Sequence, residues 1–213
     1  MQQWGLCFAD TERDVTVRCK VGNLLITLGV LCILASLALL IYGQREAAAA
    51  AKASAELMPR LIAEIEEKNA AAEQKDGDES APEDMSVVTI DGQDYIGYLV
   101  IPELSLELPV MADWSYEQLH TAPCRFSGTI QGNNLVLMAH NYIRHFGPIQ
   151  TLTVGDAVYF RDADDIITEY AVAAVETLSA TDVEKMTAGE YELTLFTCTY
   201  GGQSRVTVRC SRA

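Results

Sequence analysis

A thiol and a guanidinium are the two groups of this 213-residue chain whose spacing best suits joint chemistry. The segment 194–198 is typical of a strand, Gly201-Gly202 of a turn, and the residues from Ser204 of a second strand. A two-residue loop on the glycines pairs Cys198 with Arg205, and a four-residue loop centred on them keeps that register. Directly opposed side chains share one face of a sheet, about 5 Å apart at Cβ. The permanently cationic Arg205 would therefore favour a Cys198 thiolate or stabilise an oxyanion.

The base that such a thiol needs is expected from one of only three histidines. His140 directly follows the apolar run 135–139, which predicts a buried strand ending at His140-Asn141. A strand end is where a scaffold presents a side chain to a cleft. A cysteine with a spatially adjacent histidine is the usual arrangement of an activated thiol nucleophile. The predicted catalytic residues are His140, Cys198 and Arg205, and the residues expected to bind substrate or shape the site are Asn141, Thr197 and Tyr200.

Other polar residues receive structural interpretations. Arg209 shares the strand parity of Arg205 but lies about 13 Å further along, so Arg205 is the expected partner of the thiol. His120 ends a predicted short helix and is expected to be structural, whereas His145 is expected in a loop near the cleft mouth.

A bound metal is not expected. A zinc site needs three or four ligands, and no acidic or cysteine partner is spaced to complete one with His140 and His145. The acidic run Asp162, Asp164 and Asp165 is interpreted as a charged turn, with calcium binding as the alternative. We predict no metal and no cofactor.

Several motifs together resemble the sortases, the cysteine transpeptidases of Gram-positive cell envelopes. "NNLVLMAHN" (133–141), "TLFTC" (194–198) and "SRVTVR" (204–209) are similar to the family's His, Cys and Arg motifs. "YIGYLVIPELSLELPVM" (95–111) and "GDAVYF" (155–160) are similar to its barrel strands. The resemblance covers roughly residues 90–211 and is nearest to class B-like sortases.

The resemblance implies a reaction and its partners. The substrate would be a protein carrying an LPxTG-like sorting signal, cut between Thr and Gly and joined to a peptidoglycan or pilin amine. No inhibitory lid sequence is recognised ahead of the barrel, unlike in pilin-polymerising sortases. Two alternatives stay open: a pilin-polymerising sortase, and a non-catalytic, membrane-anchored β-barrel binding module.

The elements that must position these residues are mainly strands. An Asp-Gly turn predicts a hairpin over 87–96, and short helices are expected near Tyr116–His120 and at 182–187 with Thr181 as N-cap. Many strands at short spacing favour a barrel or sandwich. The resemblance implies a closed sortase-type β-barrel of about eight strands. The further predicted strands are 97–101, 105–110, 134–140, 157–161, 166–177, 191–199 and 204–211.

The N-terminal part predicts attachment to a membrane. Residues 21–42 carry no charge and are long enough for one spanning helix of about 20 residues, behind a polar head at 1–20. A cleaved signal peptide is the less favoured interpretation, since the apolar stretch exceeds a typical signal core. Basic residues flank the span almost evenly, so the orientation rests on the resemblance: cytoplasmic N-terminus and extracytoplasmic catalytic domain.

Between the span and the barrel we expect a helical stalk and an acidic linker at 43–86, with the catalytic domain at 87–213. The stalk carries an apolar stripe of Leu57, Leu61, Ile62 and Ile65. A solvated stalk is favoured over packing of the stripe on the barrel or on a second copy. Pro59 should kink or restart this helix.

Charge and cysteine content bound the function further. The formal net charge is −15, and no segment has the basic excess of a nucleic-acid-binding protein. Three of the six cysteines, Cys124, Cys198 and Cys210, fall in the globular part, so at least one is free. Cys210 alternates to the face opposite Cys198 and is expected in the core. Two buried thiols are favoured over a Cys124–Cys210 disulfide.

Overall fold

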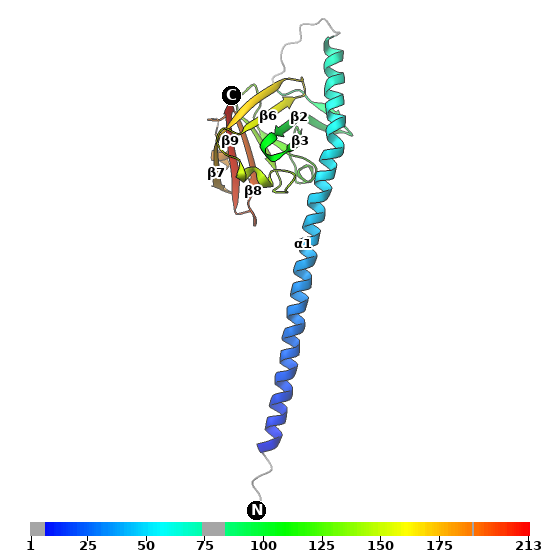
Figure 1. The fold of residues 1–213 in the computed structure, drawn as a ribbon, viewed down its shortest axis with the longest axis vertical. Helices are drawn as coiled ribbons and strands as arrows, with labels where there is room; N and C mark the ends of the chain where they lie inside the picture. Colours follow the sequence, from blue (N-terminus) through cyan, green and yellow to red (C-terminus); the bar gives the residue numbers. More distant parts are fainter. Residues whose placement is uncertain (1–6, 74–83, 189) are drawn as a thin grey trace, which may run out of the picture. The chain divides into compact units, whose positions relative to one another are not determined.

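The computed structural model describes residues 7–73, 84–188 and 190–213, with side chains from Gly22 onward (Figure 1). The chain forms two compact units, Met1–Arg45 and Glu46–Ala213, and the helix α1 (Cys7–Glu73) contributes to both. The strands of the second unit are β1 (Val88–Ile90), β2 (Gln93–Ile101), β3 (Leu106–Met111), β4 (Cys124–Ser127), β5 (Leu135–Ala139), β6 (Ala157–Asp162), β7 (Ile167–Ser179), β8 (Leu193–Cys198) and β9 (Ser204–Arg212). Its short helices are η1 (Pro102–Leu104), η2 (Gln118–His120), η3 (Gly147–Thr151) and α2 (Val183–Met186).

The strands form a closed barrel, which confirms the predicted fold class. Their order is β1-β2-β3-β4-β5-β8-β9-β7-β6, and an additional β2–β6 pairing closes the sheet. The closed part contains eight strands, with β1 added to the edge of β2 by a hairpin. Asp91 (φ 52°) and Gly92 (φ 78°) form the turn of this hairpin, as the Asp-Gly pair predicts. Two pairings are parallel, β3–β4 and β5–β8, and the second of these positions the site.

Alternation of side chains gives the barrel its core. On β8, Leu193 and Leu195 point into the main apolar cluster, as do Leu135 and Leu137 on β5 and Val206 and Val208 on β9. The intervening residues point to the outer face, as the two-residue period of a strand requires. Val136 of β5 and Phe196 of β8 meet there with Met186 of α2 in a smaller apolar cluster. The short helix α2 therefore covers part of the outer face beside β5 and β8.

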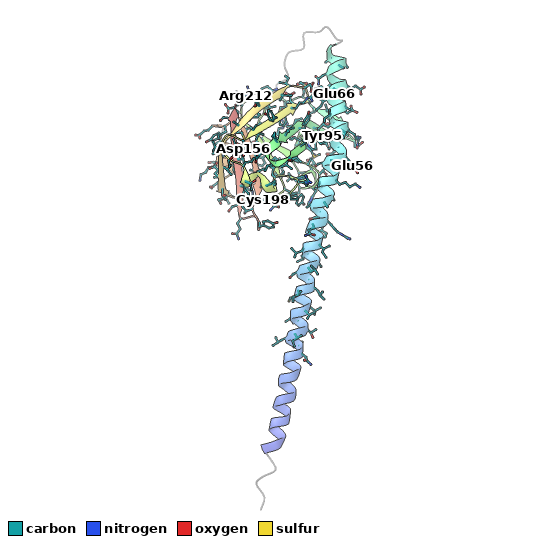
Figure 2. The ribbon with its side chains drawn as sticks, in the orientation of Figure 1. Glu56, Glu66, Tyr95, Asp156, Cys198 and Arg212 are labelled. Carbon is teal, nitrogen blue, oxygen red and sulfur yellow. The ribbon has the colours of Figure 1, made fainter. Side chains whose placement is uncertain are left out.

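The C-terminal part of α1 packs against the barrel within the second unit. Leu61 and Ile65 are buried completely or nearly so, and Leu57 is 8% exposed. They meet Tyr95 and Met111 in a second apolar cluster (Figure 2 labels Tyr95 on the side of the barrel that faces this helix). The favoured interpretation of a solvated stalk is therefore wrong for this stripe, and packing on the barrel is correct. The sequence could not decide this, because a narrow stripe suits either arrangement.

Two ion pairs join α1 to the barrel beside the buried stripe. Arg60 donates two hydrogen bonds to Asp91 in the β1–β2 turn, at 2.7 and 3.0 Å. One turn past Ile65, Lys68 donates to Asp164 at 2.7 Å. Exposed pairs of this kind contribute little energy by themselves, so the buried leucine and isoleucine side chains supply most of the stabilisation.

The acidic run forms a charged turn, as expected. The Asp162 carboxylate accepts the backbone N–H groups of Asp164 and Ile166, both at 2.9 Å. Asp164 forms an ion pair with Lys68, and Asp165 forms one with Arg161. Each of the three carboxylates therefore interacts with a group of the protein.

Three local expectations were incomplete or wrong. Asp182, not Thr181, is the N-cap residue of α2, and its side chain makes no capping hydrogen bond. The strand β4 was not predicted, because four residues beside a bulge are too few to show a period. α1 does not restart at Pro59, which lies inside the continuous helix. The acidic linker expected at the end of the segment 43–86 lies mostly outside the described residues.

The docking of α1 predicts a specific loss of stability. Because Leu61 is fully buried, Leu61→Ala should lower the free energy of unfolding of the barrel unit by about 2–5 kcal/mol. Urea unfolding of the full chain in detergent measures this value. Glu66→Ala, on the exposed side of the same helix, is the matched control and should change it by less than about 0.5 kcal/mol. Equal stability of the two variants would show that α1 is not docked in solution.

Candidate active site

The pairing of β8 with its two neighbours sets the geometry of the site. Antiparallel pairing places Cys198 of β8 directly opposite Arg205 of β9, which confirms the predicted register. The turn has four residues, since the Thr199 N–H donates to the Ser204 carbonyl at 3.0 Å and the Gly202 N–H to Thr199 at 2.9 Å. Gly201 and Gly202 both have positive φ, which explains why the turn needs glycine.

On the other side, parallel pairing brings the end of β5 beside the end of β8. Ala139 is paired with Thr197, so His140 and Cys198 are the next residues along the two strands. The Thr197 hydroxyl donates to the Ala139 carbonyl at 2.8 Å and adds a side-chain bond to this pairing. Thr197 itself is buried, and it acts on the site through this bond rather than by direct exposure.

All three predicted catalytic residues belong to the outer face of the barrel. Thr197 and Val206 are buried, and the residues that alternate with them, Cys198 and Arg205, are half-buried. His140 is half-buried as well and continues the outer parity of Val136 and Met138. Neighbouring strands lie about 5 Å apart, so the backbone positions of Cys198, Arg205 and His140, which directly follows β5, lie in a row across the ends of the three strands. Figure 2 shows Cys198 at one end of the barrel and Arg212 at the other.

The arginine of the row is held by the hairpin loop. Its Nη1 donates to the carbonyl oxygens of Gly202 at 2.9 Å and Ser204 at 3.1 Å. A guanidinium has five N–H donors, so these two bonds orient the group and leave donors for a substrate oxygen. A thiol, an imidazole and an oriented guanidinium in one row are the groups that acyl transfer through a thioester requires.

Arg209 lies on the same strand face but is committed to structure. It is 4% exposed and donates to Glu176 at 2.8 Å, to Thr194 Oγ1 at 3.0 Å and to the Met186 carbonyl at 3.0 Å. These bonds tie α2 to β8 and β7, so Arg205 is the arginine with access to the row.

Two residues that were predicted to bind substrate or shape the site, Tyr200 and Asn141, lie outside the row. Tyr200 is 97% exposed at the hairpin turn, and Asn141 is half-buried at the start of the loop after β5. Cys124 and Cys210 are free, buried thiols, and burial raises the pKa of each to about 12. They are therefore inert, as expected, and Cys198 is the reactive candidate of the barrel.

Rings that sequence reasoning did not connect surround His140. The rings of His120 and Tyr142 each lie 4.9 Å from the His140 ring, centroid to centroid. Burial, and after it the charge of His120, lowers the pKa of His140, while Glu46 partly opposes this shift. The structural role expected for His120 overlooked this contact, since the residue lies on a separate loop with no sequence signal that links it to His140.

His145 lies in a loop, as expected, and the structure adds that it is completely buried. Ser54 of α1 donates its one proton to the Thr121 carbonyl at 3.0 Å, so in its 3.4 Å contact with His145 Nε2 the imidazole must be the donor. Burial, and then the charge of His140, lowers the pKa of His145 to about 4. His145 is therefore a neutral histidine that joins its loop to α1.

The sequence comparisons identify the family of this barrel. The sortase domain family matches residues 99–213, more than half of the chain. The chain belongs to the sortase family. Sortase A of Bacillus anthracis is 31% identical over 116 residues, which are 52% of this chain and 55% of that protein. This sortase therefore spans about half the length of the curated relative that it matches.

Solved structures show the same fold. Sortase C of Streptococcus pneumoniae has a TM-score of 0.53 and 23% identity, covering 76% of this chain and 96% of that one. Sortase C of Clostridium perfringens, solved with the C-terminal cell wall sorting motif, has a TM-score of 0.52 and 24% identity, covering 74% and 90%. These relatives are named as classes A and C, and the class B-like resemblance stays a prediction.

The neutral His145 predicts a pH dependence of stability. A histidine in the unfolded chain has a pKa of 6.5, whereas the pKa of folded His145 is about 4. Between these two pH values the unfolded state therefore binds more protons than the folded state. Stability should therefore fall as the pH drops from about 6.5 to about 4, by up to about 1.4 kcal/mol per pH unit from this residue. His145→Gln keeps a donor for Ser54 and removes the titration.

The measurement is the unfolding free energy of wild type and His145→Gln across this pH range. The carboxylates titrate in both proteins, so the difference between the two unfolding free energies at each pH reports the contribution of His145 alone. The expected result is a shallower fall for the variant, and parallel curves would contradict a buried, neutral His145.

Proposed function

We propose that this sortase is a cysteine transpeptidase that cleaves an LPxTG-like sorting signal and transfers the protein to a cell-envelope amine. The observation that carries the proposal is the row of His140, Cys198 and Arg205 on the outer face, produced by two strand pairings. The family resemblance supplies the substrate class, and the three side chains supply the groups that the chemistry needs.

In the first half-reaction the Cys198 thiolate attacks the scissile carbonyl carbon of an extended peptide. Arg205 stabilises the negative charge that develops on the carbonyl oxygen. His140, as imidazolium, gives a proton to the leaving amine as the C–N bond breaks, and a thioester remains on Cys198. In the second half-reaction His140 takes a proton from the incoming amine, which attacks the thioester and releases the thiolate.

The outer face beside Cys198 is the proposed place for the extended peptide. Beneath it, Phe196, Val136 and Met186 form a buried apolar cluster, and Phe126 packs edge-on against Phe196 with ring centroids 5.3 Å apart. Phe126 and Trp114 also line a hollow of about 460 Å³ whose other lining residues are mostly polar, among them Asp113, Arg125 and Thr129. The proposed groove thus uses the barrel face and the connection that carries α2.

The acceptor amine is proposed to belong to peptidoglycan. A pilin-polymerising sortase is the alternative, favoured by similarity to sortase C of Streptococcus pneumoniae, a structure described in terms of pilin substrate specificity. A non-catalytic β-barrel binding module is the second alternative, and it would need no reactive thiol at Cys198.

The proposed location is the cell membrane, crossed once. Within the described residues, one helix is long and apolar enough to cross a membrane, with a mean hydropathy of 2.9 in its most apolar window. We propose a cytoplasmic head at 1–20, a span at 21–42, a stalk and linker at 43–86, and an extracytoplasmic catalytic domain at 87–213.

The nucleophile assignment predicts a complete loss of activity. Cys198→Ala should abolish both cleavage of LPxTG-pattern pentapeptides and transfer to an added amine, measured by mass spectrometry. It should also abolish labelling by an electrophilic peptide vinyl sulfone, which separates an enzyme from a binding module. Cys210→Ser and Cys124→Ser, at buried thiols, are the controls and should retain labelling where they fold. Normal turnover by Cys198→Ala would refute the proposed function.

The two arginines predict a separation of activity from stability. Arg205→Ala should lower kcat by about 10²–10³ with an unchanged melting temperature, because it removes one preorganised oxyanion donor. Arg205→Lys should recover part of this loss, since lysine keeps the charge without the planar fork.

Arg209→Ala is the matched comparison. It should lower the melting temperature, because Arg209 ties α2 to β8 through buried hydrogen bonds. An Arg205→Ala variant with full activity would contradict the oxyanion role.

A further inference from the structure

Two aromatic rings from separate loops flank the ring of the proposed acid–base residue, His140. His120 at the end of η2 and Tyr142 in the loop after β5 each lie 4.9 Å from His140, with interplanar angles of 43° and 37°. His120 Nδ1 and the Tyr142 hydroxyl are 3.2 Å apart, so the two flanking rings are also hydrogen-bonded to each other.

We propose that His120 and Tyr142 are positioning residues that hold the His140 ring in the orientation needed for proton transfer. This inference deepens the proposed function and rests on it. It assigns the two residues no proton transfer of their own. Their effect on the reaction passes through His140.

The His140 ring needs such support because its own polar contacts are few. Its Nε2 is buried and has no hydrogen-bond partner among the described residues. The torsion that turns a histidine ring about its Cβ–Cγ bond is broad, so a strand-end position alone does not fix the ring. Contacts from two flanking rings restrict that rotation. A displacement of about 1 Å at a reacting group can cost about 10² in rate.

Both loops that carry the flanking rings are themselves anchored. The loop after β5 folds back tightly, with the Tyr142 carbonyl accepting the N–H groups of His145 and Gly147, both at 2.9 Å. Ser54 of α1 donates to the carbonyl of Thr121, the residue after His120, and contacts His145 on the other loop. One helix residue thus ties together the two loops between which His140 is held.

The charges around His140 make its titration a useful readout. The titratable groups on the surrounding elements are His120 at the end of η2, Tyr142 and His145 on its own loop, Glu46 of α1, and Cys198 and Arg205 across the sheet. Removing His120 takes away a group whose charge opposes that of His140, and it also opens the ring to water. Both changes raise the pKa of His140, whereas a purely structural role elsewhere would leave it unmoved.

The experiment uses the full chain in detergent micelles and the variants His120→Ala, Tyr142→Ala and Tyr142→Phe. Gln118→Ala on the same short helix and Tyr159→Phe on β6 are the matched controls. The first measurement is kcat and KM for an LPxTG-pattern peptide. The second is the pH dependence of Cys198 alkylation by iodoacetamide, resolved by peptide mass spectrometry, with His140→Ala as reference.

The two alanine variants should lower kcat by about 10–10² with KM unchanged, because general acid–base catalysis contributes about 10²–10⁴ in total. Tyr142→Phe keeps the ring contact and should retain most of kcat while losing the tether to His120. In His120→Ala the alkylation profile of Cys198 should move to lower pH, because an imidazolium that persists at His140 favours the thiolate. Both controls should match the wild type.

Wild-type kcat and a wild-type alkylation profile in His120→Ala and Tyr142→Ala would overturn the inference, as would a loss confined to KM. The alkylation needs no peptide substrate, so it separates this inference from the proposed function. If no peptide is cleaved but the alkylation profile shifts in His120→Ala, the positioning role is supported and the substrate assignment fails. If only His140→Ala shifts the profile, the positioning role fails.

Discussion

The parallel pairing of β5 with β8 is the constraint on which the proposed site depends. It aligns Ala139 with Thr197 and thereby sets His140 beside Cys198, although the two residues are far apart in the sequence. A shift of one residue in a strand pairing turns every side chain of that strand to the other face. The buried Leu135 and Leu137 on β5 and Leu195 on β8 forbid such a shift, because it would expose them. The bond from Thr197 to Ala139 adds a polar restraint at the very end of the pairing, where strands otherwise fray.

The hairpin from β8 to β9 supplies the other half of the row, and it was the half most accessible to sequence reasoning. A turn centred on two adjacent glycines sets the register of the strands on either side of it. A two-residue loop and a four-residue loop give the same register here. The pairing of Cys198 with Arg205 followed from that local rule. The pairing of β5 with β8 is non-local and parallel, and no local rule predicts it. The choice of His140 depended on its position after an apolar strand and on the family motif.

Sequence reasoning failed where tertiary packing decides between two locally equivalent outcomes. The stripe on α1 has the same period whether it is solvated or packed, and only the presence of Tyr95 and Met111 on the facing barrel wall decides the matter. His145 sits in a polar, glycine- and proline-containing segment that favours an exposed loop. Its burial depends on Ser54, which lies 91 residues earlier in the sequence. The contact of His120 with His140 depends likewise on how two loops meet.

The contrast between Arg205 and Arg209 shows how one strand face can serve both structure and chemistry. Parity gives the two side chains the same side of β9, and nothing in the local sequence distinguishes their roles. Arg209 lies under α2, where carbonyl, hydroxyl and carboxylate oxygens compensate its desolvation. Arg205 lies next to the turn of the hairpin, where two loop carbonyls orient it and leave further N–H donors available.

The electrostatics of the row follow from the same placement. Burial lowers the pKa of His140, which makes its imidazolium a stronger acid toward a leaving amine but a rarer species at neutral pH. A thiolate at Cys198 and the carboxylate of Glu46 both favour that imidazolium, whereas His120 opposes it. The proposed mechanism therefore requires mutual attraction between the two residues across the β5–β8 pairing to sustain the charged state for its first step. For that reason the register of two strands, more than any single hydrogen bond, sets the reactivity of the proposed site.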